Sequence, residues 1–343
     1  MLTLEVLTQA GATPGVSHAV DRRLLDLVRE EPRRAWLRVY QLAGDVLSLG
    51  RYHVAPTDPP ASGVQLHRRL GGGRVIPLGA GFAVLSLTLP HRSALVSDDP
   101  LALRPEQVLN RCVRALLAGL RGCGVDAFYP GRDRITVAGR TLGLVSLESD
   151  PAGVTVFEAA LSVDGDWLRV GDLVAAVDRD GVVAAQVPSA AEVTSLAGLG
   201  AAVPLATLAE RVASAYIQQF GLQRCVTDIE PSLPPDADEQ ARVWVASRRV
   251  RAGLDHHAIE WSQLGVLEVY LATTGGAIDD IALCGDFIAD SPSIDRLEQR
   301  LRGVALTPAA VGAMVEGVYA DPRSFLLGVG PRSAVVDTIL RAQ

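Results

Sequence analysis

Two consecutive arginines, Arg68 and Arg69, stand just before three consecutive glycines at positions 71–73, and Arg74 follows. Adjacent glycines are costly to order and bring no side chains to pack, so the bare backbone must itself be needed there. These residue types favour close approach of an anionic ligand, whose oxygens would accept from backbone N–H groups beside the guanidinium groups. A glycine-rich loop can also be only a turn, but the flanking arginines favour phosphate binding.

The same stretch resembles the ligand-binding loop of the lipoate–protein ligase and biotin ligase catalytic domain, whose usual form is R-R-x-S-G-G-G-A-V-x-H. Three positions depart from that form: Leu70 replaces Ser, Arg74 replaces Ala and Pro77 replaces His. The positions that agree, and that the resemblance assigns to the ligand site, are Arg68, Arg69, Gly71, Gly72, Gly73 and Val75. The two arginines would either engage phosphate or lie beneath the loop.

Residues 129–147 predict a β-hairpin with a tight turn at 138–139. This stretch is similar to the family's hairpin gRNDi-v-GrKi-G-s, with Asp133 and Gly143 in place. The position of the family's catalytic lysine is occupied by Thr141. The resemblance implies that Asp133 holds Mg²⁺ or the adenosine and that Gly143 belongs to the ligand site.

The chain contains no lysine, and all 32 basic residues are arginine. Replacing lysine by arginine on the protein surface changes stability little, because exposed ion pairs contribute little to it. A lysine that acts as a compact ammonium in a reaction is not harmlessly replaced. Loss of one such charge-assisted donor costs ~3 kcal/mol, about a hundredfold in rate. Arg74 or Arg140 would have to supply the charge beside Thr141, although Arg74 is equally well explained as a surface arginine.

The resemblance implies that a medium-chain acid, lipoate or octanoate, attacks the α-phosphate of ATP with Mg²⁺ present. The acyl-adenylate is then passed to a lysine of a lipoyl carrier domain. Two other functions stay open. One is a ligase-like pseudoenzyme that binds an acyl ligand or a carrier domain without adenylating anything. The other is an octanoyl or lipoyl transferase, which is disfavoured because no cysteine lies between Cys123 and Cys225.

Composition sets the outer bounds of the protein. A length of 343 residues predicts two domains, and 48% hydrophobic with 21% charged residues is typical of a globular protein with a sizeable core. The net charge of −7 argues against a nucleic-acid partner. No apolar stretch reaches the length of a membrane span, and no signal-peptide pattern begins the chain. Four cysteines without a C-x-x-C pair favour a reducing compartment, so we expect a cytoplasmic protein.

Helical periodicity predicts amphipathic helices over 17–29, from Pro105 onward and over 205–220, with Ser17 capping the first. Cys112 lies in an apolar stripe and is expected in the core. Two strands are expected on either side of 44–45. The second leads into Tyr52 and His53, where the family has Tyr-Gln, and His53 is either a pocket residue or a hydrogen-bonded histidine under a loop.

Residues 226–240 are rich in Pro and Asp and are interpreted as an inter-domain linker. A hairpin follows, then Gly-Asp-Phe at 285–287, a helix capped by Ser293 and another starting at Thr307-Pro308. This order resembles the accessory C-terminal domain of bacterial lipoate ligases. We therefore expect an α+β protein, with a lipoate/biotin ligase-like mixed-sheet domain at 1–225 and a smaller α+β domain at 241–343.

Overall fold

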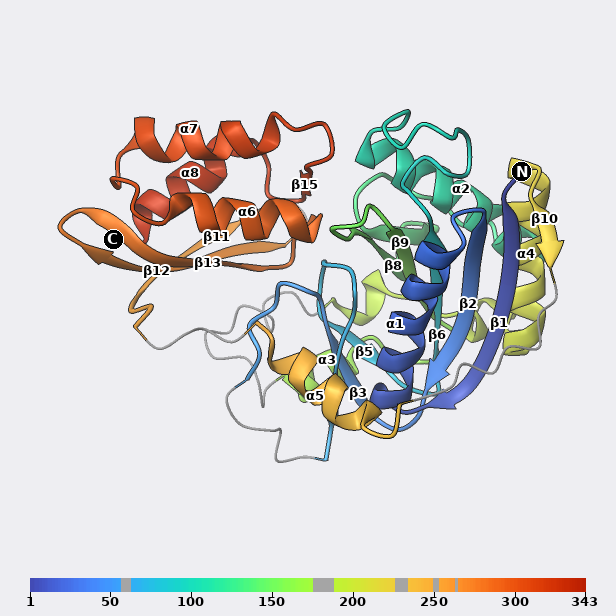
Figure 1. Cartoon of the computed structure of the whole chain (residues 1–343). Helices are drawn as coiled ribbons and strands as arrows, with labels where there is room; N and C mark the ends of the chain where they lie inside the picture. Colours follow the sequence, from blue (N-terminus) through green and yellow to red (C-terminus); the bar gives the residue numbers. More distant parts are fainter. Residues whose placement is uncertain (57–62, 175–187, 226–233, 249–252, 263–264) are drawn as a thin grey trace.

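The computed structural model describes residues 1–56, 63–174, 188–225, 234–248, 253–262 and 265–343, which form two lobes (Figure 1). The first lobe runs from β1 to α5 and is built on a seven-stranded mixed sheet. The C-terminal lobe runs from β11 to α8 and is built on a three-stranded antiparallel sheet. The expected α+β class, with a large mixed sheet and a second, smaller domain, is confirmed.

The strands of the large sheet are ordered β10-β1-β2-β6-β9-β8-β7. Strand β1 is parallel to both its neighbours, and the other pairs are antiparallel. The bounds are β1 (Thr3–Ala12), β2 (Arg34–Leu42), β6 (Phe82–Leu89), β7 (Arg134–Val137), β8 (Arg140–Ser149), β9 (Thr155–Ser162) and β10 (Gln223–Cys225). The helices of this lobe are α1 (Pro14–Glu30), α2 (Pro105–Gly122), α3 (Arg169–Val174), α4 (Leu205–Phe220), α5 (Ala237–Ala246) and the short 3₁₀ helices η2 (Ala190–Glu192) and η3 (Ala197–Leu199).

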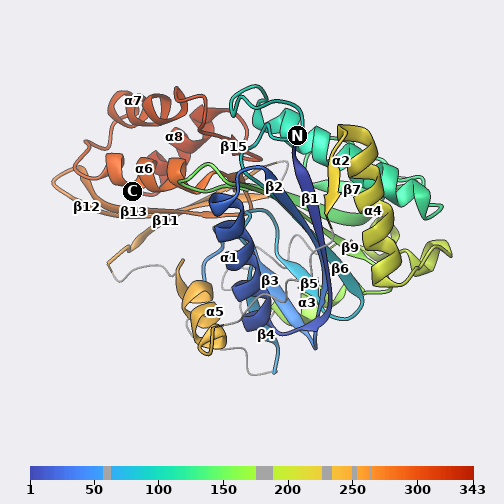
Figure 2. The ribbon, with the colours of Figure 1, turned by 45° about the vertical axis from the view of Figure 1, so that its right-hand side comes forward.

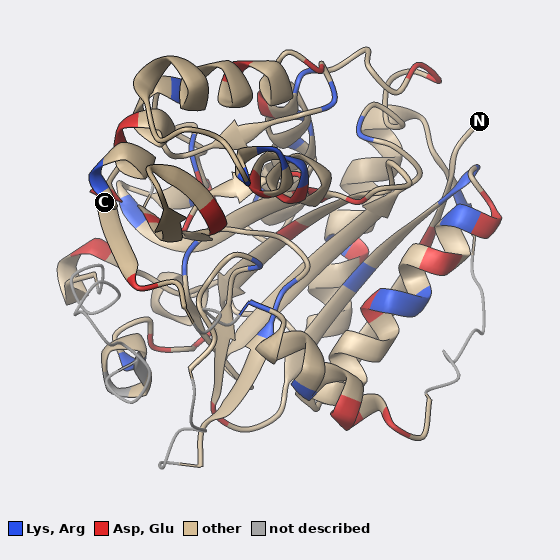
Figure 3. Cartoon of the chain, turned by 60° about the vertical axis from the view of Figure 1, so that its left-hand side comes forward, with Lys and Arg blue, Asp and Glu red and all other residues tan. Residues whose placement is uncertain are grey.

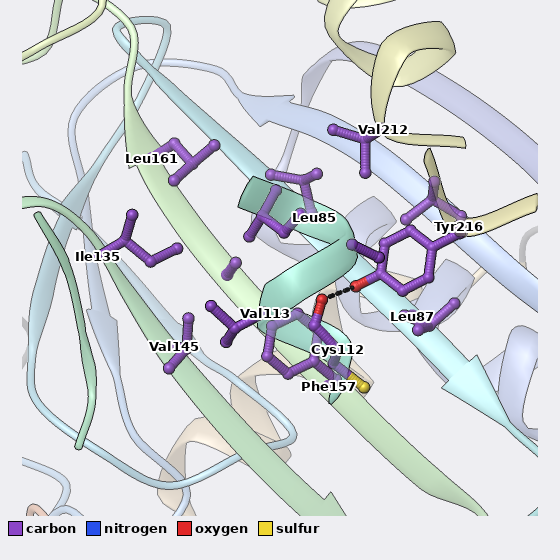
Figure 4. Packing of buried hydrophobic residues seen from close by; sticks show 14 of the residues in the cluster. Leu85, Leu87, Cys112, Val113, Ile135, Val145, Phe157, Leu161, Val212 and Tyr216 are labelled. Carbon is purple, nitrogen blue, oxygen red and sulfur yellow. Dashed lines mark hydrogen bonds between the residues drawn. The ribbon is translucent and has the colours of Figure 1, made fainter. Parts of the chain in front are cut away.

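Helices cover both faces of the large sheet, because its strands carry apolar side chains on each side. Helices α2 and α4 pack on one face, and α1 packs on the other (Figures 1 and 2). Figure 4 shows the α2–α4 face from close by, with Cys112 and Val113 of α2 among side chains of the sheet. The Tyr216 hydroxyl donates to the Cys112 carbonyl at 2.7 Å. Cys112 is fully buried, as the apolar stripe predicts.

A small sheet on the α1 side carries the glycine loop. Its order is β4-β3-β5, with β3 parallel to β4 and antiparallel to β5. Strand β4 ends at Arg68 and β5 begins at Ile76, so the seven residues 69–75 cross from one side of β3 to the other. The bounds are β3 (Val46–Leu49), β4 (Gln65–Arg68) and β5 (Ile76–Leu78). The two strands expected around 44–45 therefore form, but in different sheets.

The C-terminal lobe places its helices on one three-stranded sheet, whose order is β11-β12-β13 (Figure 1). The strands are β11 (His256–Trp261), β12 (Val266–Thr274), β13 (Ala277–Gly285), β14 (Ile288–Ala289) and β15 (Leu326–Leu327). The helices are α6 (Ser291–Leu301), α7 (Pro308–Tyr319) and α8 (Arg332–Arg341). The last two strands pair with each other, and β14 runs beside β8 of the first lobe.

Two helix caps differ from the sequence prediction. Thr13, not Ser17, caps α1, and its hydroxyl accepts from the Val16 N–H. Asp290, not Ser293, caps α6, and its carboxylate accepts from the Ser293 N–H at 3.0 Å. In both helices a proline occupies one of the first two helical positions, where its missing N–H costs nothing. The cap therefore lies just before the proline, one turn earlier than predicted.

Only part of the expected linker at 226–240 can be described. Residues 226–233 lie outside the described residues, and helix α5 begins at Ala237, inside the expected range. Helix α5 packs against α1 and β4 of the first lobe. The division of the chain into domains at 1–225 and 241–343 stays a prediction.

Charged side chains of both signs are interspersed over the helices and loops (Figure 3). Within the described ranges, none of the helices combines the length and the apolar character needed to cross a membrane.

Candidate functional site

The glycine loop is held in a shape that side chains would prevent. A β-carbon added at Gly71 would lie 2.2 Å from the Ser146 hydroxyl oxygen, and one added at Gly72 would lie 2.2 Å from the Phe287 carbonyl oxygen. Gly73 has φ +88°, a conformation that L side chains rarely adopt. The three glycines are thus required by close approach of protein groups on both sides and by the backbone turn itself.

Arg68 and Arg69 lie beneath the loop and are almost completely buried. Arg68 donates to the carbonyls of Gly50 at 2.8 Å and Arg51 at 2.9 Å, and to that of Val245 at 2.8 Å. Burial lowers the pKa of this guanidinium to about 9. Because Val245 belongs to α5, Arg68 fastens this helix to the end of β4.

Arg69 supports the loop from within. Its Nη2 donates to the carbonyls of Gly72 at 3.2 Å and Arg74 at 2.6 Å, and its Nη1 donates to the Ser48 carbonyl at 3.0 Å. Both guanidinium ends therefore hold backbone carbonyls of the loop and of β3.

Two loop amides donate to protein acceptors. The Gly71 N–H donates to Glu158 Oε2 at 2.8 Å, and the Gly73 N–H donates to the Phe287 carbonyl at 2.9 Å. The Gly72 carbonyl accepts from the Ser146 hydroxyl at 2.9 Å. Burial raises the pKa of Glu158 to about 7, although nearby Arg69 opposes the rise. The loop is thus closed between β8 and β9 on one side and the C-terminal lobe on the other.

A cavity of about 50 Å³ opens beside the loop and joins the two stretches that the sequence singles out. Its lining combines two arginines and a threonine with apolar side chains. The lining residues are Arg74, Val75, Pro77, Arg134, Thr141, Leu144, Trp167, Val170, Pro188 and Val193. Arg74 and Thr141 therefore line one cavity, although they are far apart in the sequence.

Arg74 forms an ion pair with Asp133, in which its Nε lies 2.6 Å from Asp133 Oδ2. The side chains are 14% and 5% exposed, so the pair is largely shielded from water. Asp133 Oδ1 is buried and has no hydrogen-bond partner. Both residues also line a second, very small cavity of about 10 Å³, together with Arg69, Ser146 and Glu158. That volume is close to the size of one water molecule.

Of the other predicted site residues, some line this cavity and some do not. Val75 lines it and packs with Leu47 and Leu49 of β3. Arg140 is exposed at the start of β8 and is not among the lining residues of the described cavities. Gly143 lies within β8, where a β-carbon would come 2.6 Å from the Ala160 carbonyl oxygen. Its role in the structure is to let β8 and β9 approach.

Several lining residues carry no signal in the sequence motifs, Arg134 and Trp167 among them. Arg134 follows Asp133 at the first position of β7, with Ile135 next to it in the core. Alternation along the strand could have placed Arg134 on the side opposite the core. Trp167 lies in the connection between β9 and α3, where the spacing of apolar residues does not indicate that its side chain lines the cavity.

The two lobes meet beside the glycine loop. His53 Nε2 lies 2.6 Å from Asp286 Oδ1, and Tyr52 stacks on Phe287 with 4.5 Å between ring centroids. His53 is thus buried at the lobe interface, with its ring within ion-pair distance of Asp286. Glu148 accepts from the Ser291 N–H at 2.9 Å, and burial raises its pKa to about 7 against the opposing charge of Arg51.

The resemblance implies a magnesium ion, and the described side chains show which of them could bind it. Among the described residues, three or more His, Cys, Asp or Glu side chains do not gather at any point that could hold a metal ion. Mg²⁺ is commonly bound by one or two carboxylates together with substrate phosphates, rather than by a cage of protein ligands. Asp133 Oδ1, buried and without a partner, fits that smaller requirement.

Two protein families match the sequence. Residues 13–217 match the lipoyl protein ligase A/B catalytic domain, and residues 254–321 match the bacterial lipoate protein ligase C-terminus. A comparison with curated proteins finds no significant match.

Several solved structures share the fold. P. falciparum LipL1 in complex with lipoate is 12% identical with a TM-score of 0.72, and the match covers 98% of this chain and 99% of that one. A bi-partite lipoate protein ligase from Thermoplasma acidophilum, from a structural analysis of that ligase and its E2 lipoyl domain, is 16% identical with a TM-score of 0.52. The match covers 71% of this chain and 92% of that one. Lipoate-protein ligase A bound with ATP is 17% identical with a TM-score of 0.50, over 71% and 94%.

Proposed function

The chain belongs to the lipoyl protein ligase A/B catalytic-domain family, and from this premise we propose that it is a lipoate–protein ligase. It would activate lipoate or a related medium-chain acid with ATP and transfer the acyl group to a lysine of a carrier domain. Support for the ligands comes from relatives of the same fold, which were solved with lipoate or with ATP. Support for the partner comes from the T. acidophilum ligase and its E2 lipoyl domain.

The observation that carries this proposal is that Arg74 and Thr141 line the same cavity. In the sequence pattern, Thr141 stands where the family has its catalytic lysine, and Arg74 stands where the family has a small residue. We infer from this shared lining that the guanidinium of Arg74 would act in place of the lysine amine. A cation in a largely shielded site stabilises charge that builds up as a carboxylate attacks a phosphate.

In this proposal the carboxylate would lie near Arg74, Arg134 and Thr141, and the acyl chain would follow the apolar side chains of the lining. Arg140, exposed at the hairpin turn, would act only if that turn moved.

In this proposal, ATP and Mg²⁺ would bind beside Arg74 and its ion-pair partner Asp133. Bound Mg²⁺ would neutralise phosphate oxygens, with Asp133 Oδ1 as its protein ligand. Gly71, Gly72 and Gly73 would present the backbone near the phosphates. Since the Gly73 N–H donates to Phe287 in this arrangement, it can donate to a phosphate only after Phe287 withdraws. Arg68 and Arg69, already bound to backbone carbonyls, would hold the loop rather than touch the nucleotide.

A second function, binding of an acyl ligand without catalysis, is favoured by one observation. Loop amides that would face the phosphates already have protein acceptors, Glu158 and Phe287. The absence of lysine from the sequence also favours binding without catalysis. A binding protein of this kind would be stabilised by lipoate but would release no AMP.

The test is the intact mass of a purified lipoyl carrier domain after incubation with the protein, ATP, Mg²⁺ and lipoate. A ligase adds one lipoyl group to the carrier and releases AMP in equal amount. Because the chain has no lysine side chain, it offers no side-chain amine to compete with the carrier as acceptor. An unchanged carrier mass without AMP, combined with a higher melting temperature in lipoate, would establish the binding function instead.

A further inference from the structure

Arg134 is one of the residues that line the cavity beside the glycine loop, and its place in the large sheet directs it there. It is the first residue of β7 and lies opposite Leu144 of β8, so the two side chains project from the same face of the sheet. Leu144 lines the same cavity. The next residues along the two strands, Ile135 and Val145, project from the other face into the core. The strand register therefore places Arg134 on the cavity side of the sheet.

The Arg134 side chain has no ionic partner among the described residues. Arg74 forms its ion pair with Asp133, whereas the Arg134 guanidinium forms neither a hydrogen bond nor an ion pair with any residue that the structure describes. The carboxylate of Glu192 is close enough to be affected by its charge. Hydrogen bonds from Ser189 lower the pKa of Glu192, and Arg134 adds to this effect. That carboxylate is exposed and accepts from the Ser189 N–H and hydroxyl, both at 2.8 Å.

The described lining of the cavity thus carries one positive charge that no lining carboxylate balances. It includes two arginines and neither Asp nor Glu, and Asp133 balances only Arg74. On an open surface, water solvates an unpaired guanidinium and the loss of a partner costs little. Beside apolar side chains the effective dielectric constant is lower, and a bound anion gains more from the charge. A ligand with one negative charge at one end and an apolar remainder matches this lining.

We propose that Arg134 binds the ionised carboxylate of the acid, and that this contact makes the cavity select acids over neutral amides with the same chain. The inference deepens the proposed function and rests on it, because it takes the cavity to be the acyl site. Arg74 stays paired with Asp133 and acts on the charge that builds up during attack on the phosphate. The contact with Arg134 is strongest before the reaction. A carboxylate oxygen loses its negative charge as it bonds to the α-phosphorus, while the bond to pyrophosphate breaks and pyrophosphate leaves with the electron pair.

Binding of a charged and a neutral ligand with the same chain tests this without ATP. Lipoate and lipoamide differ only in the carboxylate, which the amide replaces by a neutral group. In calorimetry, the wild type should bind lipoate about tenfold or more tightly than lipoamide, because the amide forms no charge-assisted pair with the guanidinium. In Arg134→Gln this preference should fall about tenfold, with little change in the affinity for lipoamide. Arg134→Lys keeps the charge without the planar fork and should retain most of the preference.

Arg121 supplies a charge-matched control. It is exposed at the end of α2, on the other face of the large sheet, and lines none of the described cavities. Arg121→Gln removes one positive charge from the chain and should leave the preference for lipoate unchanged.

Kinetics separate a binding role from a catalytic one. In lipoate-dependent exchange of pyrophosphate into ATP, Arg134→Gln should raise the lipoate concentration at half-maximal rate about tenfold and change the maximal rate little. A fall in the maximal rate, with that concentration unchanged, would contradict a role in binding the carboxylate.

Three binding results would overturn the proposal: an unchanged preference in Arg134→Gln, an equal loss of affinity for lipoate and lipoamide, or the same fall in preference in Arg121→Gln. If AMP is still released by the wild type, only this proposal fails and the ligase function stands. If the preference falls as expected but the wild type releases no AMP, Arg134 stands as the carboxylate site and only the ligase activity fails. If neither ligand binds to the wild type, the cavity is not the acyl site, and both proposals fall.

Discussion

Arg74 is the residue that we propose as the cation of the reaction. It is fixed by an ion pair with Asp133, it lines the cavity beside Thr141, and its carbonyl is held by Arg69. A guanidinium differs from an ammonium in staying charged at every accessible pH and in presenting a planar fork of donors. Such a group can contact a carboxylate and a phosphate together, which is the task the family gives to its lysine.

Restoring the lysine tests whether Arg74 has taken over its role. Thr141→Lys places an ammonium on the wall of the same cavity. In an Arg74→Ala background, it should recover adenylate formation by about tenfold or more, because one cation replaces the other near the reacting oxygens. The measurement is AMP release with lipoate and a carrier domain, compared with Thr141→Met as a neutral control of similar length. Equal recovery of AMP release by Thr141→Met would show that the charge of the lysine is not the cause.

The residue types of the site were predictable only in part. Pattern agreement identified the glycine loop, Asp133 and Thr141, because the loop and the hairpin are local. Arg134 and Trp167 were missed, since each joins the cavity through the arrangement of strands β5, β7 and β8 and the connection after β9. The burial of Arg68 and Arg69 beneath the loop was one of two alternatives in the sequence, and only the positions of β3 and α5 distinguish them.

At the level of elements, the glycine loop, the segment after β3 and the segment at β14 bring the two lobes into contact. The Gly73 N–H donates to Phe287, just before β14, and Tyr52 after β3 donates to the Ala289 carbonyl at 3.1 Å. The caps of α1 and α6 show why element ends were harder to predict than elements. Periodicity places the apolar face correctly, whereas the proline after Thr13 or after Ser291 decides where the first turn begins.

Gly72→Ala tests this contact. The added methyl group would lie 2.2 Å from the Phe287 carbonyl oxygen, so one of the two lobes must shift. Overpacking of this kind costs about 1–3 kcal/mol, and the melting temperature should fall. Gly312→Ala in α7 is the matched control. A β-carbon there meets nothing within 4 Å, so helix propensity alone should stabilise the C-terminal lobe by about 0.5–1 kcal/mol. A Gly72→Ala protein as stable as the wild type would mean that the lobes are not in firm contact at this point.

For the molecule as a whole, buried titratable groups make stability depend on pH. Burial raises the pKa of Glu148, at the lobe interface, and of Glu158, under the loop, to about 7. Burial lowers the pKa of His18 to about 4 and that of His67 to about 3. As the pH rises from about 4.5 to about 7, the two glutamates contribute less and less to the free energy of unfolding. The two histidines contribute more and more to it as the pH rises to about 6.5. The opposing contributions largely cancel between about pH 4.5 and pH 6.5.

Glu148→Gln separates the interface contribution from the others. The pKa of Glu148 is higher in the folded protein than its ordinary 4.5, so its stabilising contribution is full below pH 4.5 and is lost as the pH rises through about 7. Glutamine keeps an oxygen acceptor for the Ser291 N–H but never ionises. The variant should match the wild type near pH 4.5 and exceed it by about 3 kcal/mol at pH 8. Urea unfolding at the two pH values measures the difference, and a constant difference would contradict the assignment.

The central claim, that this lysine-free chain forms an acyl-adenylate with Arg74 as its cation, is tested most directly by lipoate-dependent exchange of labelled pyrophosphate into ATP. Exchange reports the first step alone, because it needs no carrier domain. The account predicts exchange by the wild type, a loss of about a hundredfold or more in Arg74→Ala, and little change in Arg140→Ala, whose side chain is exposed outside the described cavities. Exchange by Arg74→Ala at the wild-type rate, or a wild type that binds lipoate and shows no exchange, would contradict it.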